Sequence, residues 1–269
     1  MKRELLSIFA VFLSINLFAV VLPEGTDARI NDIQMNDDGI IEKVYLSEPI
    51  QLNTFLGRIE AVGEVLFNSE GKIIEFTPNK DGTAESPIGS LNFKGRETIK
   101  FYDNGTVSSM TLNRDTILIV NEREFTCYPS FISFYEDWKP FGFRISKDTN
   151  IKLKCGDVIC AKGSIINFYS DGNIFNMELG APAEINSADG KILAFKNLIL
   201  TPQETPVFAT VLKSDGLTSN YGKIFPKEGS EITFYENGKI AKVVPQDITI
   251  VQYEGSTFMT IANTELGFD

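Results

Sequence analysis

The chain has 269 residues and a formal net charge of −11, from 25 Lys and Arg against 36 Asp and Glu. This acidic balance argues against nucleic-acid binding, because proteins that bind phosphate backbones carry a basic surface. Histidine is absent, which excludes His-based catalytic triads and His-ligated zinc. Apolar residues make up 43% of the chain, enough for a sizeable core, and the 21 Phe and 8 Tyr favour strands.

The N-terminal segment has the pattern of an export signal. A short basic start is followed by an apolar run of 18 residues, Leu5–Leu22, and then by helix-breaking residues. We therefore expect residues 1–28 to be a signal peptide, cleaved after Ala19 or after Ala28, and the protein to be periplasmic or extracellular. Because 18 apolar residues can just span a bilayer, the alternative is an uncleaved membrane anchor formed by residues 5–22.

A seven-residue motif recurs through the rest of the chain, and we call its last residue the pivot. The six copies are Ile33–Gly39, Val65–Gly71, Ile99–Gly105, Ile132–Trp138, Ile166–Gly172 and Ile232–Gly238. Their pivots are separated by 32, 34, 33, 34 and 66 residues. Since 66 is twice 33, a copy near residue 205 has degenerated. We expect residues 29–269 to form a single all-β repeat domain with an irregular insertion at 189–227.

Each copy predicts a β-hairpin. Asn-Gly at the end of the motif accepts positive φ and favours a two-residue type I′ turn. That turn would place Phe168 opposite Phe175, and Ile166 opposite Met177. The fold prediction is therefore all-β, with tandem hairpins of about 33 residues that form an extended or two-layer antiparallel sheet. A propeller-like arrangement and a β-barrel are the alternatives.

The hairpin core, an aromatic residue followed by x-Asn-Gly-Lys-Ile as in residues 235–240, resembles the MORN-type repeat, in the variant found in exported bacterial proteins. The resemblance covers only the hairpin of each copy. The family's period is shorter, and its additional Gly positions are not matched. The resemblance implies an elongated sheet used in protein or membrane-surface contact.

Aromatic residues at the hairpin tips are the candidate binding residues. Trp138 occupies a pivot where the other copies have Gly, and because positive φ is costly for a bulky side chain we expect a different turn there. Aromatic side chains are enriched at binding hot spots. A second stripe is predicted on the opposite face, from the pairs Tyr102/Val107, Tyr169/Ile174 and Tyr235/Ile240. The candidates are thus Trp138, Tyr102, Tyr135, Tyr169 and Tyr235, unless they only cover the sheet.

Other reactive side chains have simpler explanations. In an oxidising compartment a disulfide could join Cys155 to Cys160 or Cys127 to Cys160, and a catalytic Cys would need a base that His cannot supply here. A recurring aspartate is best explained as a residue that begins a turn by bonding its own backbone two residues on, rather than as a calcium ligand. Its copies are Asp81, Asp115, Asp148 and Asp247. No metal or cofactor is expected.

These patterns predict an exported, non-catalytic repeat protein that serves as a binding or scaffolding surface in the cell envelope. Its partner would be a protein or an envelope glycan, with membrane contact only through an uncleaved N-terminal segment. Two alternatives stay open. One is an envelope polysaccharide-acting enzyme that uses paired carboxylates, and the other is an outer-membrane β-barrel.

Overall fold

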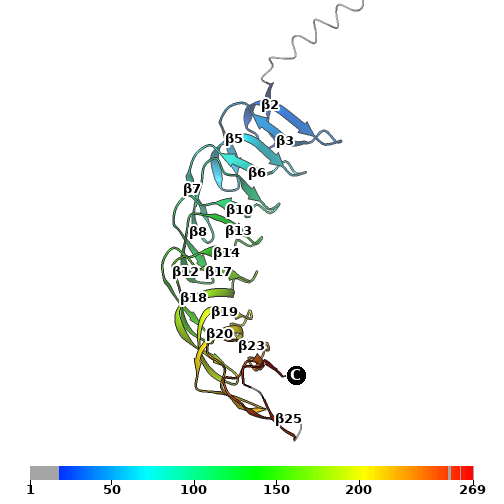
Figure 1. Ribbon diagram of the computed structural model, residues 1–269. Helices are drawn as coiled ribbons and strands as arrows, with labels where there is room; N and C mark the ends of the chain where they lie inside the picture. The colour runs from blue at the N-terminus through cyan, green and yellow to red at the C-terminus, as the bar shows by residue number, and fades with distance from the viewer. Residues whose placement is uncertain (1–17, 254–255, 261, 269) are drawn as a thin grey trace, which may run out of the picture. The chain divides into compact units, whose positions relative to one another are not determined.

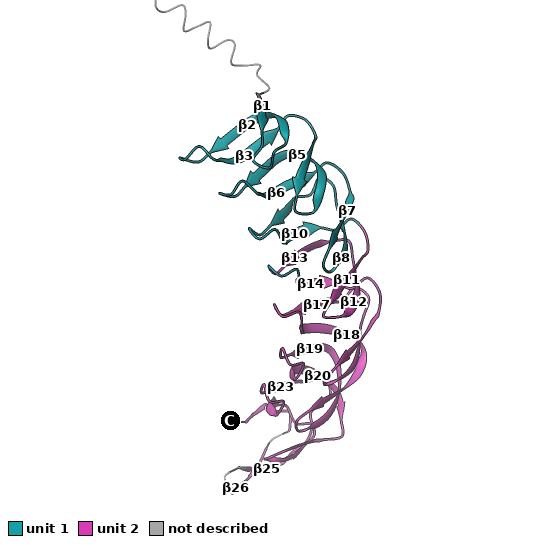
Figure 2. Cartoon of the chain, turned by 180° about the vertical axis from the view of Figure 1, so that it is seen from behind, with its two compact units in different colours: residues 1–113, 136–138 teal, residues 114–135, 139–269 magenta. Residues whose placement is uncertain are grey.

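The computed structural model describes residues 18–253, 256–260 and 262–268, so most of the expected signal segment lies outside the described residues. Every regular element in these ranges is a β-strand, and the strands described there pair antiparallel, which confirms the all-β prediction (Figure 1). No helix in this part of the chain is long and apolar enough to cross a membrane. The chain divides into two compact units (Figure 2): unit 1 comprises residues 1–113 and 136–138, and unit 2 comprises 114–135 and 139–269.

Unit 1 is an antiparallel meander with two additional hairpins. Its main sheet pairs strands in the order β1, β2, β3, β5, β6, β9, β10. Strand β4 pairs with the first half of β5, and β7 pairs with β8. The strands are β1 (Phe18–Val21), β2 (Asp27–Met35), β3 (Ile41–Leu46), β4 (Ile50–Thr54), β5 (Gly57–Phe67), β6 (Ile73–Pro78), β7 (Gly82–Ser86), β8 (Gly89–Phe93), β9 (Ile99–Phe101) and β10 (Val107–Thr111).

Unit 2 repeats the same plan. Its main sheet runs β13, β14, β17, β18, β19, β20, β23, β24, β27. Further hairpins are formed by β11–β12, β15–β16, β21–β22 and β25–β26. The strands are β11 (Thr116–Val120), β12 (Arg123–Cys127), β13 (Phe131–Phe134), β14 (Pro140–Arg144), β15 (Thr149–Leu153), β16 (Gly156–Cys160), β17 (Ile165–Phe168), β18 (Ile174–Ser187), β19 (Gly190–Leu200), β20 (Pro206–Ser214), β21 (Leu217–Ser219), β22 (Gly222–Ile224), β23 (Glu231–Phe234), β24 (Ile240–Val243), β25 (Ile250–Tyr253), β26 (Ser256–Met259) and β27 (Leu266–Gly267).

The motif forms a hairpin, but its turn differs from the predicted one. In the copy ending at Gly105, the Tyr102 N–H donates to the Thr106 carbonyl at 2.8 Å, and the Gly105 N–H donates to the Tyr102 carbonyl at 2.9 Å. This is a three-residue loop closed by a left-handed residue and a β-bulge, not a two-residue type I′ turn. The bulge adds one residue to the second strand. Phe168 therefore pairs with Ile174, and not with Phe175 as expected.

The pivots share one backbone conformation whatever their side chain. The Gly pivots have positive φ, and so do Trp138, at 73°, and Glu204, at 63°. The expectation of a different turn at Trp138 was therefore wrong. At Glu204 the Thr201 N–H donates to the Thr205 carbonyl at 2.8 Å, as in the other copies. The segment 189–227 is thus not irregular: it contains strands β19–β22 and a turn of the same kind with Glu204 as its pivot.

Five turns pack against pivots 48 to 51 residues further along the chain, and we call them docking loops. They are the turns at Pro23, Phe55, Asn121, Lys154 and Ala188. A Cβ added to Gly105 would lie 2.3 Å from the Phe55 ring, and one added to Gly71 would lie 2.7 Å from Pro23 Cβ. In unit 2 the Ala188 N–H donates to the Gly238 carbonyl at 3.0 Å. The pivot glycines at 71 and 105 therefore provide both positive φ and the space for a loop.

The core lies on one face of each sheet. Alternate strand residues are buried, including Phe76 in unit 1 and Phe125 in unit 2. The rings of Phe125, Phe143 and Phe168 contact one another at centroid distances of 5.3 to 5.7 Å. Each fully buried side chain of this size contributes roughly 1.5–3 kcal/mol. The side chains on the opposite face of each sheet and in the turns are the ones that remain available for contacts outside the core.

Candidate functional site

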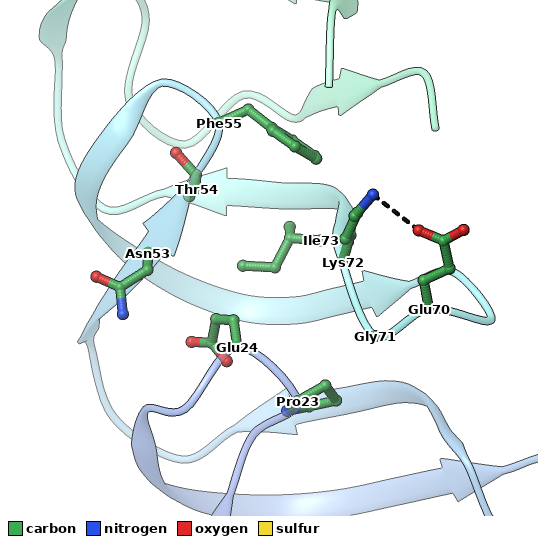
Figure 3. Close-up of a pocket in the computed structure, with 9 residues that line it drawn as sticks. All are labelled: Pro23, Glu24, Asn53, Thr54, Phe55, Glu70, Gly71, Lys72 and Ile73. Atoms are coloured by element: carbon green, nitrogen blue, oxygen red, sulfur yellow. Dashed lines mark ion pairs between the residues drawn. The ribbon is translucent and has the colours of Figure 1, made fainter. Parts of the chain in front are cut away.

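A cavity of about 340 Å³ opens in unit 1, where a docking loop meets two turns (Figure 3). It is lined by the turn at Pro23 and Glu24, by residues 53–55 at the end of β4, and by residues 70–73 of the β5–β6 turn. Both carboxylate oxygens of Glu24 are buried and have no hydrogen-bond partner. A buried polar group without a partner is unfavourable, so Glu24 is an atypical residue of this unit.

The other walls of this cavity are formed by apolar side chains, by the Asn53 amide and by the paired Lys72 and Glu70. Figure 3 shows Phe55 and Glu24 on opposite sides of Ile73. The Phe55 ring is 43% exposed and packs edge-on against Phe101, with centroids 5.5 Å apart. The Lys72 ammonium pairs with the Glu70 carboxylate at 2.7 Å. The cavity therefore combines an aromatic rim, an aliphatic floor and one uncompensated carboxylate.

A second cluster, in unit 2, surrounds the Glu204 pivot. The Glu204 side chain is buried and pairs with Arg123, with Oε1 and Nη2 2.5 Å apart. Its Oε2 accepts the Lys154 N–H at 3.0 Å, and Arg123 also donates to the Lys152 carbonyl at 3.1 Å. The cavity beside them measures about 390 Å³. Because these bonds hold a non-glycine residue at positive φ, the cluster stabilises the turn that the sequence pattern had lost.

Three of the predicted binding tyrosines connect neighbouring hairpins. The Tyr135 hydroxyl donates to the Phe168 carbonyl at 3.2 Å, and the Tyr169 hydroxyl donates to the Leu200 carbonyl at 2.8 Å. The Tyr235 hydroxyl donates to the carbonyl of Phe268. Burial raises the pKa of Tyr169 above its ordinary value, with smaller contributions from nearby carboxylates. Because these hydroxyls already donate to main-chain carbonyls, a binding partner could contact only the faces of the tyrosine rings.

The remaining two candidates lie in unit 1 and are half-buried. Tyr102 begins the turn that ends at Gly105, and Trp138 is itself a pivot. Neither residue lines the cavity at Glu24 or the cavity beside Glu204. Their role as binding residues stays a prediction.

The predicted second stripe is displaced by one residue. Val107, Ile174 and Ile240 are buried in the core, so they cannot pair with tyrosines on the open face. The bulge turns Phe141 and Phe175 outward instead. The surface pairs that result, which we call the aromatic stripe, each join a half-buried tyrosine to an exposed phenylalanine. They are Tyr135 with Phe141, at a centroid distance of 4.0 Å, and Tyr169 with Phe175, at 5.1 Å.

Polar side chains accompany the aromatic stripe on the same strands. Asn167 on β17 donates its side-chain N–H to the Asn176 side-chain oxygen on β18 at 2.7 Å. Gly142 on β14 pairs with Asn167, and a Cβ there would lie 2.1 Å from the Asn167 oxygen. Side-chain amides thus occur close to the stripe residues along the chain, with Asn167 two positions before Tyr169 and Asn176 directly after Phe175. Sequence reasoning missed Phe141 and Phe175 because it placed the turn without its bulge.

The cysteines are free and buried. Cys155 lies in the turn before β16 and Cys160 is the last residue of β16, five positions on, about 16 Å in extended chain, which is too far for a disulfide. The Cys127 thiol donates to the Thr116 carbonyl at 3.1 Å. Burial raises the pKa of each thiol to about 12. All three are thus protonated near neutral pH and act as small core residues.

Two of the recurring aspartates brace the main chain between strands. Asp81 Oδ1 accepts the Gly95 N–H at 2.7 Å, and Asp148 Oδ1 accepts the Lys162 N–H at 2.7 Å. In both cases the N–H group that bonds the carboxylate lies 14 residues further along the chain. The prediction of a bond to the backbone two residues on was therefore wrong for these two aspartates. The Gly95 hydrogen bond lowers the pKa of Asp81 below its ordinary value. Among the described residues, no three Cys, Asp or Glu side chains gather as a metal site would require.

Comparison with known proteins adds no family to this description. No protein-family model matches the chain, and no curated protein matches its sequence. The two sites that stand out are therefore interpreted from their own geometry: the Glu24 cavity in unit 1 and the aromatic stripe in unit 2.

Proposed function

We propose that this protein is an exported, non-catalytic repeat protein whose sheet serves as a binding surface in the cell envelope. The observation that carries the proposal is the aromatic stripe. Phe141 and Phe175 are 40% and 38% exposed, although a folded chain gains by burying Phe. Exposed aromatic residues gathered on one surface are a property of interaction sites. The resemblance of the hairpins to MORN-type repeats points in the same direction.

The stripe is held in place before any partner arrives. The hydroxyls of Tyr135 and Tyr169 are bonded to the main chain of the next hairpin, which fixes the direction of both rings. Each ring also packs against a phenylalanine from the bulge. Binding then costs little side-chain entropy, because the rotamers are already restricted.

An envelope glycan suits the stripe better than a protein does. Tyr135 and Tyr169 follow strands that are two places apart in the sheet, a separation of about 10 Å. Two aromatic faces at that interval can stack on two sugar rings of one polysaccharide chain. The Asn167 and Asn176 amides can hydrogen-bond sugar hydroxyls beside the rings.

The test is sedimentation of the full chain with insoluble envelope polysaccharide, comparing the wild type with a Phe141→Ser/Phe175→Ser double variant. We expect saturable binding by the wild type and at least a tenfold loss in the variant. The control is Ile117→Ser/Ile119→Ser, which removes two apolar residues of β11 that are each 49% exposed and should bind like the wild type. Equal loss in both variants, or no saturable binding by the wild type, would contradict the proposal.

A further inference from the structure

The negative charge of the chain is concentrated in unit 1. Its described residues, 18–113 and 136–138, contain 8 Lys and Arg against 17 Asp and Glu, a net charge of −9. The described residues of unit 2 contain 15 Lys and Arg against 16 Asp and Glu, a net charge of −1. Unit 1 therefore attracts cations much more strongly, and it is the unit that contains the Glu24 cavity.

Within the cavity, Glu24 is the acid whose charge is not compensated. Neither of its carboxylate oxygens has a hydrogen-bond donor. The cation in the lining, Lys72, is paired with the exposed Glu70 at 2.7 Å, and Figure 3 shows it directed towards that residue. A buried carboxylate without a donor costs desolvation free energy, which a charged donor can offset. A cation that carries N–H groups would therefore compensate the charge of the Glu24 carboxylate and donate hydrogen bonds to it.

The shape and lining of the cavity specify that cation further. Pro23 and Ile73 offer aliphatic contact, and Phe55 offers an aromatic face that a cation can approach. Long basic side chains pack their methylene stems along such surfaces and leave the charged head free to bond. At about 340 Å³ the cavity is near the lower end of ligand-pocket sizes, which suits one side chain.

We propose that the Glu24 cavity binds the guanidinium or ammonium group of an Arg or Lys side chain belonging to a basic polypeptide. A polypeptide is favoured over a small polyamine because the charge of −9 extends over the hairpins of unit 1, whereas the cavity admits one side chain. The inference rests on the proposed function, that the protein is a binding surface, and adds to it a second site on the other unit.

The test uses the full chain and a fluorescent peptide of alternating Gly and Arg, with anisotropy as the readout. The matched peptide carries citrulline, which has the shape of Arg without its charge. We expect Glu24→Gln to weaken binding of the Arg peptide about tenfold or more, the effect of losing a charged hydrogen-bond partner. Glu42→Gln is the control, because it makes the same change at an exposed residue of unit 1 and should alter binding little.

Thermal stability separates a binding role from a structural one. Removing an unpartnered buried charge should leave the Tm of the free Glu24→Gln chain unchanged or higher, whereas a carboxylate needed for folding would give a lower Tm and contradict the inference. Equal weakening by both variants would mean that only the general charge attracts the peptide. Binding of spermidine as tight as that of the peptide would assign the cavity to small molecules. If glycan binding is lost in the stripe variant but Glu24→Gln binds the peptide normally, this inference alone fails.

Discussion

At the scale of single residues, the pivots are restricted by two independent requirements. Positive φ disfavours any side chain, and the docking loop fills the space where Cβ would be. Gly39 meets only the first, because a Cβ there would have nothing within 4 Å, while Gly105 meets both, because Phe55 lies 2.3 Å away. Glu204 shows how the requirements are relaxed: its side chain takes over bonds to Arg123 and to the loop at Lys154.

Replacing two glycines separates these requirements. Gly39→Ala should lower the free energy of unfolding by about 1–2 kcal/mol, the cost of left-handed backbone for a residue with Cβ. Gly105→Ala should lower it by a further 1–3 kcal/mol or so, because the Phe55 ring must move. Urea denaturation of both variants measures the difference. Equal losses would show that the loop adjusts freely and that only φ matters at the pivot.

The sequence could predict the period, the hairpins and the pivot preference, since Asn-Gly marks a left-handed residue. It could not distinguish a type I′ turn from a three-residue loop with a bulge, because both place Gly at that point. Because the bulge adds one residue to the second strand, Phe175 lies at the surface rather than in the core, and Ile174 is buried. Glu24 had no signal at all, since its isolation follows from what surrounds it in space rather than from its neighbours in the chain.

At the scale of elements, the first hairpin favours one of the two predicted cleavage sites over the other. Strand β1 pairs with β2, joining Val20 to Ala28, and both Leu22 and Ala28 are buried. Cleavage after Ala28 would remove β1 and the turn that packs on Gly71. Cleavage after Ala19 would keep the turn and half of the strand.

If the chain is exported, we therefore expect its mature N-terminus at residue 20 rather than residue 29. Intact mass of the endogenous protein after cell fractionation measures this. A recombinant chain that begins at residue 29 should be less stable by at least roughly 1.5–3 kcal/mol, since it lacks the buried Leu22. A mature chain starting at residue 29 would contradict the expectation. A full-length, membrane-retained chain would instead support the anchor formed by residues 5–22.

At the scale of the whole molecule, stability is a sum of local terms between neighbouring hairpins, as in other repeat architectures. In unit 2 the tyrosine hydroxyls supply one such term at each step. Buried thiols, braced aspartates and docked loops also act within one or two repeats. The units can therefore carry different surfaces, acidic in unit 1 and aromatic in unit 2, on the same backbone plan.

Tyr169→Phe tests this local character, because it removes only the hydroxyl that bonds the Leu200 carbonyl and keeps the ring against Phe175. We expect the loss of about 1 kcal/mol, the usual value of one hydrogen bond. Native-state hydrogen exchange should then quicken in β17–β20, while exchange in the distant β25 of the same unit stays unchanged. Equal acceleration along all of unit 2 would show instead that its hairpins unfold as one cooperative body, and that stability is not summed from step to step.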